Sequence, residues 1–167
     1  MSEITNLSDV YIHELKDLWS ANDQMLRAVK KMAPKATHPK LKQMLETSQK
    51  GVAGHTDLLK TLLDKHGAKL SKEHCKGMEG LAAEALKHTL EEGPDQGPVL
   101  DAVIIAQYQR MTHYGITGFG TAAAFSHALK FKDDDKQLKD AVKDMYNTDQ
   151  LMTELAEAAV NADAVDE

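Results

Sequence analysis

Polar residues interrupt the apolar stripes of the predicted helices at similar heights. They are Asn22, Ser48, His55, Arg110, His113, Tyr146 and Asp149. An arginine in a helix interface cannot lose its proton and must meet an anion, so we expect Arg110 to pair with Asp149. The leading interpretation is a satisfied polar network in the bundle core, which would consist of Asn22, Arg110, His113, Tyr146 and Asp149.

Part of the same set could instead bind a metal. His55, His113 and Asp149 would supply two imidazoles and one carboxylate, the ligand set of mononuclear non-haem iron(II) sites. Arg110 beside them would oppose a cation. The sequence therefore assigns no cofactor, and iron or another divalent metal is the alternative.

A second group of chemically capable residues lies near the middle of the chain, at His74, Cys75 and Glu79. Such ligands could take zinc, but His74 and Cys75 would point about 100° apart on a helix, which spoils a shared site. We expect Cys75 to be a small buried hydrophobe. It is the only cysteine, so no internal disulfide can form, and a reducing compartment fits best.

The pattern of apolar residues is helical throughout. Apolar positions recur every three to five residues over 10–32, 41–62, 78–90, 99–129 and 138–156. We expect Asn6 and Thr37 to cap the first two helices, Ser71 to open the third and residues 133–135 to cap the last. Residues 1–160 should form one domain, and the acidic tail 161–167 should be disordered.

Four long helices with one apolar stripe each can bury those stripes only against one another. A shorter helix falls in the long connection between the second and third of them, which is the ferritin-like arrangement. The fold prediction is therefore all-α, a ferritin-like four-helix bundle with an additional short helix. Gly115, Gly118 and Gly120 within one helix predict close approach of a neighbouring helix or a kink. The segment 107–114 could line a pocket, although tyrosines in bundles are more often packed.

Several short strings resemble the YciE/YciF family of ferritin-like bacterial stress-associated proteins, and they occur in the same order over nearly the whole chain. They are Val10-Tyr11-Ile12-His13-Glu14-Leu15, Ser20-Ala21, Cys75-Lys76-Gly77-Met78-Glu79-Gly80-Leu81, Glu84-Ala85, Asp101-Ala102, Ala106-Gln107, His113-Tyr114, Gly120-Thr121, Thr148-Asp149 and Leu155-Ala156. The Met-Glu-Gly-Leu string is the most particular. The resemblance implies a bundle that is often dimeric and belongs to the general stress response.

The resemblance also implies a di-iron site, built from a Glu on the first helix, a Glu-x-x-His on the second and carboxylates on the last two. Carried over to this chain, those positions hold Asn22, Lys50, Ala53, Thr112, Gly115, Lys143, Asp144 and Met145, and only Asp149 is retained. A bridged iron pair needs about four carboxylates. We therefore expect the di-iron site to be degenerate.

The chain has a net charge of −6, which argues against nucleic-acid binding and against docking to an anionic membrane. The first residues lack the pattern of a signal peptide, so we expect a cytoplasmic protein. The sequence points to a stress-response protein that acts as a dimeric binding or structural unit with little or no catalysis. A metal-dependent, ferroxidase-like oxidoreductase with a remodelled metal site at the bundle centre is the alternative. The small-molecule or protein partner stays open.

Overall fold

The computed structural model describes residues 4–70 and 74–165, and these residues form helices and connections without any strand. The long helices are α1 (Leu7–Met32), α2 (Pro39–Lys65), α4 (Pro98–Ala128) and α5 (Lys132–Leu155), and the shorter α3 is Lys76–Leu86. Short helical turns follow α1, α3 and α5 at Ala33–Lys35, Lys87–Glu91 and Ala156–Val160. Every described helix falls short of what crossing a membrane requires.

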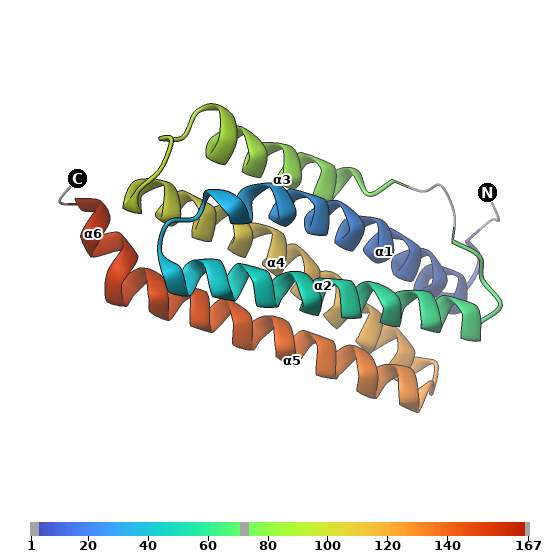
Figure 1. The fold of residues 1–167 in the computed structure, drawn as a ribbon. Coiled ribbons are helices and arrows are strands. Elements are labelled where there is room, and N and C mark those ends of the chain that lie inside the picture. The colour runs from blue at the N-terminus through green and yellow to red at the C-terminus, as the bar shows by residue number, and fades with distance from the viewer. Residues whose placement is uncertain (1–3, 71–73, 166–167) are drawn as a thin grey trace.

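The four long helices make an antiparallel bundle with one long crossover (Figure 1). Helix α1 runs against α2, and α4 runs against α5, whereas α2 and α4 point the same way. The crossover between α2 and α4 contains α3, which packs against α1 and α4. A bundle with a single long crossover is the ferritin-like topology, so the fold prediction is confirmed.

The C-terminal segment is more ordered than we expected. Helix α6 (Asn161–Val165) continues the line of α5 after a π-helical turn, so residues 161–165 are helical rather than disordered. The apolar anchor is Val160, which is almost fully buried directly before α6. Residues 166–167 of the tail lie outside the described residues.

The helix starts follow the sequence prediction at α1 but not at α2. The Asn6 carboxamide oxygen accepts a hydrogen bond from the Asp9 backbone N–H at 3.0 Å. At α2 the capping residue is His38, whose Nδ1 accepts from the Lys40 N–H at 3.2 Å. Thr37 was therefore wrongly predicted as the cap, because its side chain turns toward α4. The predicted cap Ser71 lies outside the described residues.

A buried carboxylate on α4 explains the position of Thr37. Asp101 is 2% exposed and accepts three hydrogen bonds from the loop between α1 and α2. The Thr37 N–H and hydroxyl donate to it at 2.7 and 2.6 Å, and the His38 N–H donates at 2.8 Å. Asp101 thereby ties the start of α2 to α4.

A second buried carboxylate lies at the opposite end of α2. Asp134, in the first turn of α5, is fully buried and receives hydrogen bonds from the Tyr11 hydroxyl at 2.9 Å and the Lys65 ammonium at 2.6 Å. The His66 Nε2 also lies 2.6 Å from it. Burial raises the pKa of Asp134, but these bonds outweigh it and hold the pKa below the ordinary aspartate value. Residues 133–135 were predicted to serve as a cap of the last helix. That prediction did not include the buried bonds by which Asp134 connects α5 to α1 and to the end of α2.

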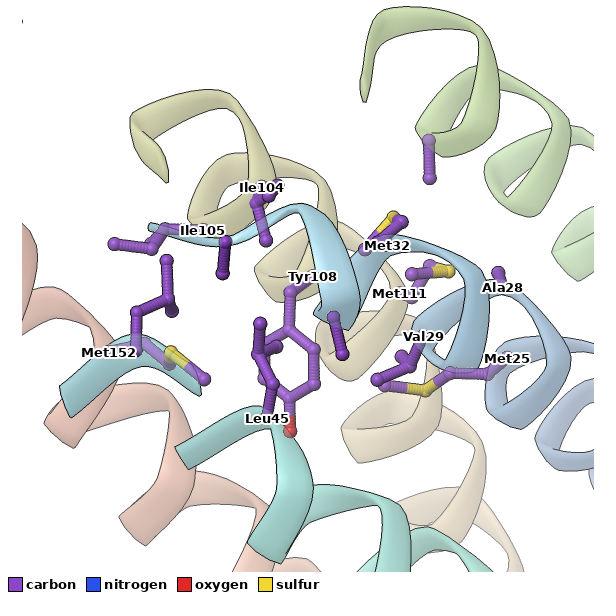
Figure 2. Close-up of a cluster of buried hydrophobic side chains, with 14 of the residues drawn as sticks. Met25, Ala28, Val29, Met32, Leu45, Ile104, Ile105, Tyr108, Met111 and Met152 are labelled. Carbon is purple, nitrogen blue, oxygen red and sulfur yellow. The ribbon is translucent and has the colours of Figure 1, made fainter. Parts of the chain in front are cut away.

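The apolar core consists of two clusters, one in each half of the bundle. One contains Met25, Val29, Leu45, Tyr108 and Met152, and Figure 2 shows these side chains directed into the space between the helices. The other contains Tyr11, Leu15, Leu62, Phe119 and Leu138. The two clusters adjoin at mid-height, where α1, α2 and α4 carry polar or small residues.

The three glycines near the middle of α4 have different surroundings. A side chain at Gly118 would collide with Leu18 of α1, and a Cβ at Gly115 would lie 3.2 Å from the Met145 sulfur. Nothing lies within 4 Å of the equivalent point at Gly120. The predicted close approach of helices therefore holds at Gly118 and Gly115, and Gly120 does not require it.

Gly118→Ala should destabilise the protein, whereas Gly120→Ala in the same helix should stabilise it. Overpacking against fully buried Leu18 costs on the order of 1–3 kcal/mol, which outweighs the helix propensity gained. At Gly120 the gain of roughly 0.5–1 kcal/mol is unopposed. Urea unfolding of both variants measures the difference. Equal changes in the two free energies of unfolding would contradict the close contact of α1 and α4.

Asp134→Ala should lower the free energy of unfolding at neutral pH by about 3 kcal/mol, the low end for breaking a buried ion pair, because Lys65 stays half in solvent. Asp134 has a lower pKa in the folded protein than in the unfolded chain. Its contribution is therefore complete above the unfolded pKa and is lost as the pH falls through the folded pKa.

The control for this prediction is Asp149→Ala, which removes a carboxylate bonded to the exposed His113 and should cost about 1 kcal/mol or less. Urea unfolding from neutral pH to pH values below the ordinary aspartate pKa compares both variants with the wild type. A loss at Asp134 no larger than at Asp149 would show that the buried cluster does not stabilise the bundle.

Candidate functional site

A cavity of about 500 Å³ lies at mid-height, between α2 and α5, and reaches inward to α1 and α4. Its position coincides with the level where the two apolar clusters adjoin. The helices contribute as follows: Asn22 and Met25 from α1; Gln43, Met44, Thr47, Ser48, Gly51, Val52 and His55 from α2; Tyr108, Thr112 and Gly115 from α4; and Asp144, Met145, Asn147, Thr148 and Leu151 from α5.

The deep end of the cavity carries neutral polar groups. Asn22, Ser48, Tyr108 and Thr112 are all buried, and each lines the cavity. The Ser48 hydroxyl donates to the Leu45 carbonyl at 2.9 Å, and the Thr112 hydroxyl donates to the Tyr108 carbonyl at 3.0 Å. Burial raises the pKa of Tyr108 although the two hydroxyls oppose this, so its phenol is protonated at neutral pH.

His55 joins the deep end of the cavity to its mouth. Its ring packs on Phe119 with the ring centroids 5.8 Å apart, and its Nε2 lies 3.6 Å from Asp144 Oδ2. Burial lowers the pKa of His55, and the weaker opposing effect of Asp144 does not restore it. The Asp144 side chain is 71% exposed. At neutral pH the imidazole is therefore uncharged, and the nearby carboxylate is solvated.

The structure does not form the core network that the sequence predicted. Arg110 and His113 are exposed, and Tyr146 is 53% exposed. His113 Nε2 lies 2.9 Å from Asp149 Oδ2, so these two form a partly solvated pair on the outside of α4 and α5. Asp149 also accepts from the Gln109 carboxamide at 3.1 Å.

Arg110 was expected to pair with Asp149, and this is wrong. The guanidinium instead lies at a shallow surface depression that it shares with His88, Glu92 and Gln107. Residues 103, 106, 110 and 113 lie along one side of α4, and at 110 and 113 this side faces outward, not into the core. Asn22 is the one member of the predicted network that is buried and faces the cavity.

The predicted metal ligands do not converge. His55 lines the cavity, whereas His113 and Asp149 pair at the surface. His74 and Glu79 lie 3.3 Å apart, and the Cys75 sulfur faces the Tyr114 hydroxyl at 3.0 Å instead of them. Burial raises the pKa of the Cys75 thiol. Within residues 4–70 and 74–165, no three His, Cys, Asp or Glu side chains gather into a metal-binding group.

The positions that the family resemblance relates to di-iron ligands mostly line this cavity: Asn22, Thr112, Gly115, Asp144 and Met145. Lys143 and Asp149 do not line it, and Lys50 and Ala53 lie in an outer depression beside Leu26 and Lys30. The inward face of α2 presents Ser48, Val52 and His55 in their place. Asp144 is the single carboxylate among the described lining residues, so a bridged iron pair does not fit this donor set.

Several cavity residues were not predicted from the sequence. For the segment 107–114 a pocket was one alternative and packed tyrosines the favoured one; Tyr108 and Thr112 are both buried and line the cavity. Met44 and Leu151 were not predicted to lie at the cavity, because the spacing of apolar residues along one helix does not indicate where the facing helix leaves space. Gly51 of α2 also lines the cavity, and nothing lies within 4 Å of the point where its Cβ would be.

Comparison with known proteins supports the fold. A family model described as a domain of unknown function, DUF892, matches residues 6–165. Protein YciF of Escherichia coli K12 is 31% identical over 159 residues, which is 95% of each chain. The crystal structure of the E. coli stress protein YciF superposes with a TM-score of 0.87 at 31% identity, covering 95% of this chain and 99% of that one. YcfI of Rhodopseudomonas palustris superposes with a TM-score of 0.83 at 28% identity, covering 91% and 96%.

The topology and the position of the cavity define a ferritin-like helical-bundle protein. The family model matches nearly the whole chain, and the sequence similarity to protein YciF also extends over nearly the whole chain. This chain belongs to the DUF892 family, and the family resemblance seen in the sequence is confirmed.

Proposed function

We propose that this protein is a stress-response binding protein, whose ferritin-like bundle encloses a small molecule at mid-height and does not oxidise iron. The observation that carries the proposal is the chemistry of the cavity. Its deep side chains are neutral, and its carboxylate, Asp144, lies exposed at the mouth. The role in the stress response is supported by the likeness to the E. coli stress protein YciF.

The volume of the cavity supports binding of a small molecule. Ligand pockets have volumes of roughly 300–1,000 Å³ and are mostly apolar with a few polar groups, and the cavity fits this description. Met25, Met44 and Met145 contribute flexible thioether walls that adapt to the shape of a ligand. The cavity therefore suits binding of an organic molecule better than coordination of an ion.

The metal-dependent oxidoreductase has less support. A single ion at the cavity would find one imidazole, His55, and one carboxylate, Asp144, whereas catalytic mononuclear sites use three protein ligands. His113 and Asp149 cannot add to this pair, because they bond to each other on the outside of the bundle.

Protein purified without a histidine tag should hold less than one iron per chain after anaerobic loading with Fe²⁺, and it should not accelerate oxidation of Fe²⁺ by oxygen. The reason is the shortage of carboxylates at the cavity. Elemental analysis and oxygen consumption measure the two quantities. His55→Gln and Asp144→Asn are the matched variants. Two tight irons per chain would refute the proposal, and one ion lost in both variants would favour the oxidoreductase.

We further propose a homodimer in the cytoplasm, without nucleic-acid or membrane partners. The family resemblance supports the dimer, and the net charge of −6 supports the absence of anionic partners. Tyr146 on α5, which does not line the cavity, offers an exposed aromatic side chain at 53% exposure.

Light scattering should give a mass of about twice the 18.4 kDa chain, independent of concentration across the micromolar range. We expect this mass because the two chains would associate through outer helix faces, in an interface that is stable at micromolar concentrations. A series of dilutions provides the control for weak association. A monomer at every concentration, or a particle with the mass of a 24-subunit shell, would show that the dimer is wrong.

A further inference from the structure

The side-chain amide of Asn22 is a polar group at the deep end of the cavity that makes no hydrogen bond within the described part of the protein. The residue is 5% exposed and lines the cavity on the α1 side. No described residue forms a hydrogen bond with its side chain. Its carboxamide atoms are accessible from the cavity. A ligand that enters the cavity can therefore bond to Asn22 in place of water.

The bonding pattern of a carboxamide specifies its best partner. The oxygen accepts and the NH₂ donates, side by side in one plane. A ligand that satisfies both atoms presents a donor and an acceptor side by side, as a carboxamide or a lactam does. An ester, a ketone or an ether can satisfy only the NH₂ of Asn22. Reciprocal pairing of two amides is therefore the interaction that this side chain favours.

The charge of the cavity restricts the ligand further. No Lys or Arg lines it, the His55 imidazole is uncharged at neutral pH, and the Tyr108 phenol is protonated. An anion would be buried without a counter-charge and would approach the Asp144 carboxylate at the mouth. A cation would find its only carboxylate in solvent, far from the deep end. A neutral ligand avoids both costs.

The apolar side chains that line the cavity indicate the chemistry of the rest of the ligand. Val52, Leu151 and the thioethers of Met25, Met44 and Met145 surround the space between Asn22 and the mouth. Burying an apolar body against them is favourable by roughly 25 cal/mol per Å². The ligand therefore has an apolar body with one polar end.

We propose that the cavity binds a neutral apolar carboxamide or lactam, oriented by a reciprocal amide pair with Asn22. This proposal rests on the proposed function, because it requires that the cavity bind an organic molecule. The amide lies at the deep end, near Thr112, and the apolar body extends along the methionines toward the gap between α2 and α5.

The test uses a neutral fluorophore, N-phenyl-1-naphthylamine, displaced by three competitors of similar size. These are 1-naphthamide, methyl 1-naphthoate and the 1-naphthoate anion. The amide offers a donor and an acceptor, the ester only acceptors, and the anion carries a charge. The wild type should bind the amide about ten-fold more tightly than the ester, and the anion most weakly.

Asn22→Leu should abolish the preference for the amide over the ester, because the amide loses two hydrogen bonds to Asn22 whereas the ester loses one. The matched control is Asn147→Leu, the same substitution at an exposed position of the cavity mouth, which should keep the ten-fold preference. In the wild type, 1-naphthamide should also shift the Asn22 side-chain NH₂ resonances in nitrogen–proton spectra, a measurement that needs no variant.

The outcomes separate the two proposals. Gly51→Phe places a ring at the cavity mouth, where nothing lies within 4 Å of a Cβ, and should block binding of the fluorophore. Fluorophore binding that Gly51→Phe does not reduce, or no binding at all, would refute the binding function itself. Binding blocked by Gly51→Phe, with equal affinities for amide and ester, would overturn only the amide proposal. A preference for the amide that persists in Asn22→Leu would do the same.

Discussion

Burial of four apolar helix stripes against one another is the interaction on which the rest of this structure depends. Such burial contributes roughly 25 cal/mol per Å² of apolar surface, and it is the main term that opposes chain entropy. The stripes are interrupted at one height by Asn22, His55 and Thr112. The core is therefore divided into two clusters, and each half of the bundle is held by its own apolar contacts. The cavity lies where neither cluster fills the space.

The division is tolerated because α2 is fixed at both ends by buried carboxylates. Asp101 holds the start of α2 through Thr37 and His38, and Asp134 holds its end through Lys65 and His66. Each carboxylate comes from another helix, so the bonds set the height of α2 relative to α4 and α5. Helix α2 packs closely along α1 but makes far fewer contacts with α5. The middle of the α2–α5 seam can therefore stay open without loss of register.

The fold was predictable because helix periodicity and breaks depend on local sequence. The buried residues of α2 agree closely with the predicted stripe, whereas α5 buries Leu138 and Met152 as predicted but also Ala141 and Leu155, which the predicted stripe did not include. Helix α4 behaves differently, because α1, α3 and α5 all pack against it and it buries residues on most of its circumference. A line of residues on such a helix cannot be assigned to the core by spacing alone. Arg110 and His113 were misplaced for this reason.

The candidate site was less predictable, because its features depend on residues far apart in the chain. Asp134 bonds to residues 68 and 123 positions away, and nothing beside it in the sequence indicates that it is buried. In a di-iron bundle, metal ligands cross-link four helices at mid-height, and binding of the ions contributes to folding. Here small and neutral residues stand at that level, and the cross-links lie at the two ends of α2 instead. Rigid ends with an open middle leave the Asn22 amide facing the cavity, where a ligand can reach it without any change in the register of the helices.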